Sequence, residues 1–254
     1  MKLSIKSSPL FRSASLAQLL LFAIITPSLR ADDQMAQPSQ PVQLNHLHYL
    51  ADGKPNAIAL LAPPPPLDSP EQAADMTEVR AVCRAAPGND VAIAFTEKKF
   101  DIFNFTPAIG PFFVPGKFPK TEAFFHRVQK DAEAATDHAK DFYKRPRPYA
   151  VDPSLASGKL EKSFSYPSGH ATESMVLALV LADLFPDQHD AIIAEARTIG
   201  WHRVEIARHY PTDIYAGRVL AQAIVRQMKK SDTFQKDFAE AKAELAIVQT
   251  AAKN

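Results

Sequence analysis

The spacing of apolar residues along this chain is typical of helices rather than strands. In residues 120–144 apolar side chains recur every three or four positions, which places them on one face of a helix. Pro146 and Pro148 then end that helix, because proline lacks the amide hydrogen that a helix needs. The alternation of apolar and polar residues that is typical of strands is almost absent. The same helical pattern recurs in residues 70–86, 90–101, 169–185, 188–207, 211–229 and 233–248.

These patterns predict an all-α fold, a compact helical bundle. A Pro/Gly/Phe-rich loop at 103–119 and a polar loop at 150–166 interrupt the helices. The phenylalanines of the first loop either cap an active site or fill the hydrophobic core. The core role is favoured, because clustered phenylalanines are usually buried. They are Phe103, Phe105, Phe112, Phe113 and Phe118.

The first 31 residues have the pattern of a secretory signal peptide. Lys2, Lys6 and Arg12 precede a short apolar stretch at residues 16–25. That stretch is too short for a bilayer, which needs about 20 apolar residues. We therefore expect residues 1–31 to be cleaved and the protein to be periplasmic or secreted; a retained membrane anchor or a buried first helix is the alternative. Residues 32–48 are polar and predict a mobile leader, and residues 49–250 a single helical domain.

The charge balance excludes some classes of partner. The chain has 29 basic and 28 acidic residues, and the signal segment contains four of the basic ones and no acidic ones. The remaining chain has a formal net charge of −3, which argues against a nucleic-acid partner. No later apolar run reaches membrane-spanning length, so no stable membrane insertion is expected. Cys83 is the single cysteine, so no internal disulfide can form.

Three short motifs contain the candidate chemistry. Together they supply three cations, two imidazoles, one carboxylate and a small-residue turn that precedes a helix. This combination suits an enzyme that holds a phosphate group and attacks it with a histidine. The motifs are Lys140-x6-Arg147-Pro148, Pro167-Ser168-Gly169-His170 and Arg203-x5-His209-x3-Asp213.

The second motif predicts an anion site. Ser168 is a good helix N-cap, and Gly169 allows close approach of the backbone to a ligand. The start of a helix attracts anions through its unpaired amides. His170, in the first turn, would lie beside the bound anion and could protonate the leaving oxygen.

The other two motifs add a nucleophile and positive charge. Asp213 opens the helix that follows His209 and can reach back to its ring, which fixes the tautomer and leaves the second nitrogen free to attack. Lys140, Arg147 and Arg203 neutralise phosphate oxygens without a metal. Three cations would also repel a divalent ion, so no metal and no cofactor are expected.

At these residues the chain resembles the type 2 phosphatidic acid phosphatase superfamily, and more closely the secreted bacterial class A non-specific acid phosphatases. The resemblance extends to the segments Tyr49-Leu50-Ala51, Leu60 to Pro66, Ser165-Tyr166 and Phe234 to Leu245. It implies an all-helical domain of the acid phosphatase and vanadium haloperoxidase type, often dimeric, that hydrolyses small phosphate monoesters.

The resemblance also implies roles for the motif residues. His209 is implied as the nucleophile that forms a phosphohistidine, His170 as the acid for the leaving group, and Asp213 as the residue that orients His209. The residues implied to hold phosphate are Lys140, Arg147, Ser168, Gly169 and Arg203.

One departure from that family stands beside the site. The residue before Arg203 is usually serine, and here it is His202. A bulkier, titratable ring at this position either perturbs the pocket or points away from it. Two other functions stay open: a vanadate-dependent haloperoxidase, because it shares the three motifs, and, because of His202, a non-catalytic phosphate-binding protein with a degraded site.

Overall fold

A computed structural model describes residues 47–51 and 53–251 of the chain, all within one compact unit that spans residues 40–254. The expected signal peptide at 1–31, and the leader as far as residue 46, lie outside the described residues. The leader was expected to reach residue 48, and the backbone amide of His48 donates to Asp131 Oδ1 at 2.9 Å.

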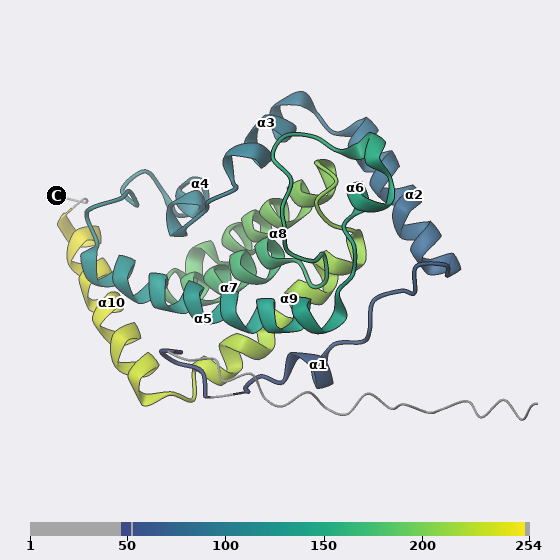
Figure 1. The fold of residues 1–254 in the computed structure, drawn as a ribbon. Coiled ribbons are helices and arrows are strands. Elements are labelled where there is room, and N and C mark those ends of the chain that lie inside the picture. The colour runs from purple at the N-terminus through teal and green to yellow at the C-terminus, as the bar shows by residue number, and fades with distance from the viewer. Residues whose placement is uncertain (1–46, 52, 252–254) are drawn as a thin grey trace, which may run out of the picture. The chain divides into compact units, whose positions relative to one another are not determined.

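The unit is organised around α7 (Gly169–Leu184), which packs against α5, α8 and α9 (Figure 1). Ten of its residues are buried, and they lie on every side of the helix, as expected of a helix at the centre of a bundle. The helix α10 packs along the outside of α5, while α2 and α3 pack against α8. The other long helices are α2 (Pro70–Ala85), α3 (Gly88–Thr96), α5 (Pro119–Tyr143), α8 (His189–Glu205), α9 (Pro211–Met228) and α10 (Asp232–Ala251).

Short helical turns occupy the connections between these helices. Across the described residues every regular element is a helix, so the predicted all-α fold is confirmed. In the same part of the chain, none of the helices combines the length and the apolar character that crossing a membrane requires. The short turns are α1 (Ala57–Leu60), η1 (Ile102–Phe105), α4 (Thr106–Ile109), α6 (Pro148–Val151), η2 (Pro153–Leu155) and η3 (Pro186–Gln188).

The long helix α5 has the predicted bounds within one residue. It begins at Pro119, where the missing amide hydrogen costs nothing, and ends at Tyr143. Lys144 follows in the left-handed region with φ 49°, and its amide bonds back to the carbonyl of Lys140. This C-terminal turn sets the direction of the chain towards Arg147.

The prediction of a helix over 90–101 is wrong at its C-terminal end, because α3 stops at Thr96. Two carbonyls after that point accept bonds from side chains of other helices: Glu97 O from His170 Nε2, and Phe100 O from Gln129. The carbonyls of the segment that follows α3 are therefore bonded across the bundle.

The phenylalanine-rich loop fills the core. Phe105, Phe113 and Phe118 have no exposed surface, and Phe103 and Phe112 pack against them. Phe112 and Phe113 also contact the ring of Phe185 beyond the end of α7. The core role predicted for this loop is confirmed, and its two short helices, η1 and α4, were not predicted.

Candidate active site

The three motifs meet at the N-terminus of α7. The amide of Ser168 donates to the backbone carbonyl of Asp213 at 3.1 Å, which joins the second motif to the third. Arg147 Nη1 lies 3.1 Å from His209 Nε2, which joins the first to the third. Lys140 Nζ lies 3.9 Å from the position that a Cβ on Gly169 would take. Residues from three distant parts of the chain thus form one cluster.

A small residue on α9 allows this convergence. A Cβ on Gly217 would lie 2.8 Å from the carbonyl oxygen of Ser168, and 3.0 Å from the hydroxyl of Thr172. Because these distances are shorter than carbon–oxygen contacts normally permit, only glycine lets α9 lie this close to the start of α7. The close approach holds Asp213 next to Ser168.

Ser168 is the N-cap of α7, as the sequence predicts. Its hydroxyl accepts a hydrogen bond from the amide of Ala171 at 3.3 Å, and its side chain is fully buried. His170 follows in the first turn of the helix. The predicted anion site is therefore at a capped helix start.

The contacts of His209 fix its tautomer. A guanidinium can only donate, so Nε2 of His209 accepts from Arg147 at 3.1 Å and carries a lone pair. The ring proton then lies on Nδ1, which is 3.3 Å from Asp213 Oδ2. This arrangement leaves a lone pair on Nε2 and places the carboxylate at the opposite nitrogen, which is the geometry a nucleophilic histidine needs.

Asp213 is held by a buried network. Its Oδ2 accepts from the Ser165 hydroxyl at 2.6 Å and from the Tyr210 amide at 3.0 Å. Its Oδ1 accepts from Arg145 Nη1 at 2.6 Å. With these donors in place, the carboxylate has little freedom to turn away from His209.

The positive charge of the site keeps His209 neutral. Burial, reinforced by the charges of Arg147 and Lys140, lowers the pKa of His209 well below its ordinary value. Burial and the neighbouring Arg147 also lower the pKa of Lys140, to about 8. Near neutral pH the site therefore combines a charged lysine with an uncharged imidazole, which is the state in which an imidazole can act as a nucleophile.

His170 is held by a backbone carbonyl. Its Nε2 donates to the carbonyl of Glu97 at 3.0 Å, and its ring lies 5.3 Å from the ring of Phe100. Nδ1 is the nitrogen left for a substrate oxygen. Burial and the charge of Arg203 lower the pKa of His170 to about 3. A proton on this ring therefore needs further negative charge nearby, such as that of a bound phosphate ester.

The position between the predicted phosphate ligands is filled by a carboxylate that sequence reasoning missed. Glu161 Oε2 lies 2.6 Å from Arg147 Nη2, and Glu161 Oε1 lies 2.5 Å from Arg203 Nη2. Burial alone would raise the pKa of Glu161, but the nearby positive charge, chiefly that of Arg147, outweighs it and lowers the pKa to about 2. An ionised carboxylate thus bridges two arginines beside both histidines, as two phosphate oxygens would.

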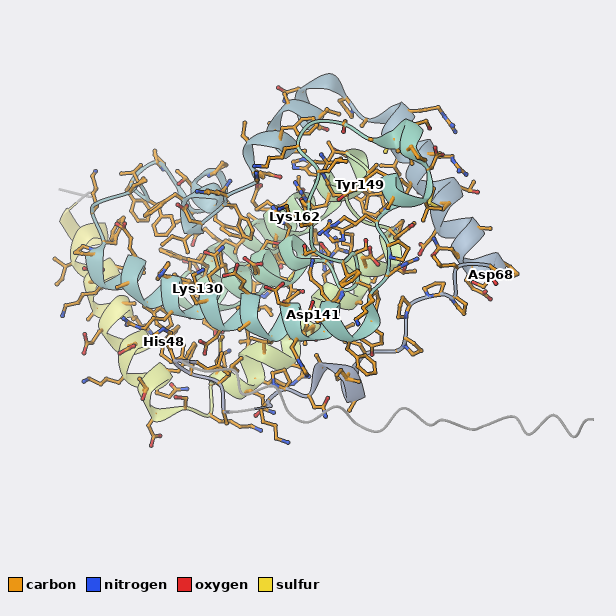
Figure 2. All side chains as sticks on the ribbon, viewed as in Figure 1. His48, Asp68, Lys130, Asp141, Tyr149 and Lys162 are labelled. Carbon is orange, nitrogen blue, oxygen red and sulfur yellow. The ribbon has the colours of Figure 1, made fainter. Side chains whose placement is uncertain are left out.

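The segment around Glu161 also provides hydrogen-bond acceptors for Lys140 and Arg147. Lys140 Nζ donates to the carbonyl of Phe164 at 3.0 Å, and Arg147 donates to both the carbonyl and the hydroxyl of Ser163. The hydroxyl of Tyr149 bonds both the amide and the carbonyl of Glu161. Tyr149, on α6, and Lys162, next to Glu161, mark this part of the chain in Figure 2.

His202 does not contact the phosphate ligands. Its Nδ1 lies 2.9 Å from Glu97 Oε2, and both side chains are buried. Burial alone would lower the pKa of His202, but the hydrogen bond and charge of Glu97 outweigh it and raise the pKa. The ring reaches the site only through Glu97, whose carbonyl accepts from His170. Of the two orientations that the sequence leaves open, the structure shows the one that points away.

Arg145 is the second residue that sequence reasoning missed. It belongs to a basic run at the end of the long helix, and such runs are usually solvated. Here its side chain is 1% exposed and donates to four groups: Gln72, Asp75, Thr212 and Asp213. The neighbouring prolines were the signal that could have predicted its burial. Prolines end the helix and change the direction of the chain, so the basic run need not lie on an exposed helix end.

Comparison with known proteins agrees with this geometry. The profile of the PAP2 superfamily matches residues 132–234, which contain all three motifs. A non-specific acid phosphatase of Providencia stuartii is 30% identical over 218 residues, covering 79% of this chain and 85% of that protein. An acid phosphatase of Zymomonas mobilis is 26% identical over 225 residues, covering 85% and 83%.

The chain belongs to the PAP2 superfamily. Among its members it is similar to acid phosphatases, and it is a phosphoric monoester hydrolase.

Proposed function

We propose that the protein is an exported acid phosphatase that hydrolyses phosphate monoesters without a metal, through a phosphohistidine intermediate on His209. The observation that carries the proposal is the oriented His209 ring: Asp213 at one nitrogen, and at the other a lone pair that faces the cations. The carboxylate of Glu161 between two of those cations supports a site built for an oxyanion. The signal-peptide pattern of residues 1–31 supports export.

The first half of the reaction transfers the phosphoryl group to the enzyme. The ester displaces the Glu161 carboxylate, and Arg147, Arg203 and Lys140 neutralise its oxygens. Nε2 of His209 then attacks phosphorus in line, a nitrogen–phosphorus bond forms, and the bond to the leaving oxygen breaks. Asp213 stabilises the charge that develops on the ring. His170 gives its proton to the leaving oxygen, and an alcohol departs.

The second half releases phosphate. His170, now neutral, takes a proton from a water molecule as that water attacks phosphorus. The nitrogen–phosphorus bond breaks, and His209 returns with its proton still on Nδ1. The low pKa of His170 in the free site suits this step. The ring holds a proton while an anion is bound beside it, and it loses that proton once phosphate has left.

Removing the charge of Glu161 is expected to strengthen phosphate binding. In Glu161→Gln, the arginines lose an internal partner with which phosphate must otherwise compete, so we expect KM for an aryl phosphate and Ki for inorganic phosphate to fall roughly tenfold. Steady-state kinetics with phosphate as the inhibitor provide both values. A variant with unchanged KM and Ki would mean that the carboxylate does not compete with the substrate.

Chelation is expected to leave turnover intact. Phosphate release from a chromogenic aryl phosphate should be the same before and after dialysis against EDTA, because side-chain cations supply the charge that a metal supplies elsewhere. Vanadate should inhibit competitively, since its five-coordinate form resembles the transition state. Complete loss of turnover in EDTA, restored by zinc or magnesium, would overturn metal independence, and absence of turnover with any phosphate ester would overturn the proposed function.

A further inference from the structure

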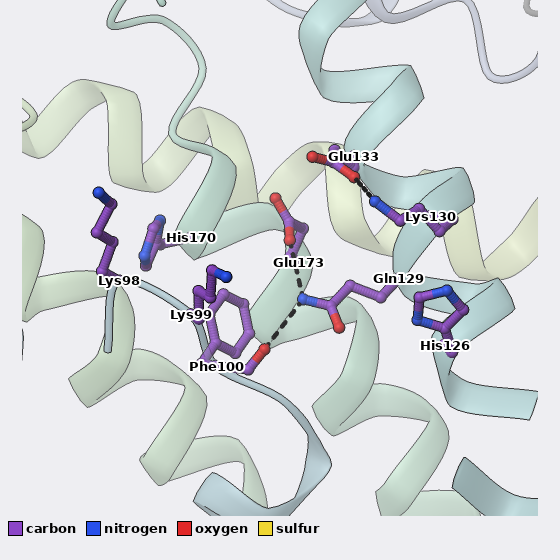
Figure 3. Close-up of a pocket in the computed structure, with 9 residues that line it drawn as sticks. All are labelled: Lys98, Lys99, Phe100, His126, Gln129, Lys130, Glu133, His170 and Glu173. Carbon is purple, nitrogen blue, oxygen red and sulfur yellow. Dashed lines mark hydrogen bonds and ion pairs between the residues drawn. The ribbon is translucent and has the colours of Figure 1, made fainter. Parts of the chain in front are cut away.

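A pocket of about 380 Å³ opens directly beside His170. Figure 3 shows His170 at one side of it, with Lys98, Lys99 and Phe100 beside the ring and Glu173 and Lys130 on the helices α7 and α5. The phosphate position itself is filled by Glu161, as described above. The pocket is thus an open space that has His170 in its wall.

The pocket lies on the leaving-group side of the site. This step rests on the proposed function, in which His170 meets the leaving oxygen. His170 lines the pocket, and its ring packs against Phe100. Whatever is attached to that oxygen must extend from His170, and this pocket is an open volume beside His170 that can receive it.

The pocket has an excess of positive charge. Lys98 and Lys99 are exposed, and within the described residues neither has an ion-pair partner. Lys130 is paired with Glu133 at 2.7 Å, so those two charges largely cancel. The two lysines that follow α3 therefore supply uncompensated positive charge at the wall nearest to His170.

Glu173 does not cancel this charge in acidic solution. Burial raises the pKa of Glu173 to about 7, against the opposing effect of the hydrogen bond from Gln129. Gln129 Nε2 donates to Glu173 Oε2 at 3.2 Å and also to the carbonyl of Phe100, so the carboxyl group is held at the floor of the pocket. Below that pKa it is an uncharged hydrogen-bonding group rather than an anion.

We propose that this pocket selects phosphate monoesters whose leaving group carries a second negative charge, a carboxylate or another phosphate, and that Lys98 and Lys99 bind that charge. A cationic leaving group would meet two unpaired lysines. A purely apolar one would find only the ring of Phe100 among mostly polar side chains. An anionic group extending from the ester oxygen meets charge of opposite sign and a neutral carboxyl donor.

The test compares esters that differ in one group. Glycerol 3-phosphate and 3-phosphoglycerate have leaving groups with the same carbon skeleton, and only the second carries a carboxylate; phosphoethanolamine supplies a cationic leaving group. The kcat/KM of each is measured in acidic buffer of low ionic strength for the intact chain and for Lys98→Gln/Lys99→Gln. The matched control is Lys236→Gln/Lys242→Gln, which removes two exposed lysines from α10.

We expect the intact chain to favour 3-phosphoglycerate over glycerol 3-phosphate and to disfavour phosphoethanolamine. The Lys98/Lys99 variant should lower the ratio for the first pair roughly fivefold, as expected for two partly screened charges, while the α10 control keeps it. An equal change in both variants would mean a general effect of net charge, and an unchanged ratio would mean that the lysines do not bind the leaving group; either result overturns the inference. If no ester is hydrolysed, the proposed function fails instead.

Discussion

Replacing His209 by alanine is expected to abolish phosphoenzyme formation with every substrate. The variant lacks the nitrogen that would bond to phosphorus. We expect turnover to fall by at least about a thousandfold. Acid-quench trapping of labelled phosphoenzyme measures the intermediate directly, and accumulation of labelled enzyme by His209→Ala would contradict the assignment.

The contrasting variant is His170→Ala. Its imidazole is proposed to protonate the leaving oxygen, so its loss should matter most for poor leaving groups such as alkyl alcohols. Nitrophenolate departs with little protonation, so nitrophenyl phosphate should be affected least. A leaving-group series run on both variants separates the two histidines. Equal losses across the series for His170→Ala would mean that His170 does not act as the acid.

The long helices of this protein were predictable because their apolar residues recur at helical spacing, or, in α7, form a nearly continuous apolar run. α5, α7, α8 and α9 all lie within two residues of the ranges that their periodicity predicts. The end of α3 was not predictable, because it depends on partners that are far away in the sequence. The carbonyl of Glu97 accepts a hydrogen bond from His170, 73 residues later, and its carboxylate bonds to His202. No local pattern contains that information.

The same distinction applies to the candidate site. The three motifs predicted which residues cluster, since a capped helix start and an i, i+4 His–Asp pair have defined local geometry. Glu161 was not predicted, because it lies in a polar loop where a glutamate is ordinarily solvated. Its position follows from tertiary contacts of that loop, the bonds from Tyr149 to its backbone and the two arginines at its carboxylate.

Replacing Arg145 by glutamine is expected to destabilise the fold by about 3–5 kcal/mol. The guanidinium neutralises two buried carboxylates, Asp75 and Asp213, and lies 3.9 Å from the centre of the Tyr210 ring. Glutamine removes the charge and leaves both carboxylates uncompensated in a buried site. The free energy of unfolding, measured by urea titration, gives the effect.

A surface pair on α2 provides the matched control. Arg80 pairs with Asp152 at 2.9 Å, but its side chain is 45% exposed. Arg80→Gln should cost less than about 1 kcal/mol, because solvent screens such pairs. If Arg145→Gln unfolds no more easily than Arg80→Gln, the buried network does not depend on the charge of Arg145.

The stability cost of Arg145→Gln should also depend on pH. Without the guanidinium, the carboxylates of Asp75 and Asp213 stay in a buried site with little compensating charge, which is costly for the folded variant. Acid relieves this cost by neutralising buried negative charge, so the variant should gain stability, relative to the intact chain, as the pH falls. The difference in unfolding free energy between the two proteins should therefore narrow in acid.

Activity should not recover with that stability. A protonated Asp213 no longer stabilises the charge that develops on His209, so kcat for Arg145→Gln should stay low at the acidic pH where the folded variant is most nearly restored. Arg145→Lys retains one charge but cannot reach the four partners at once, and should lie between the two proteins in both properties. Unfolding curves and kcat, measured over the same pH series, test this separation; activity that rises in step with stability would mean that Arg145 acts on the fold alone.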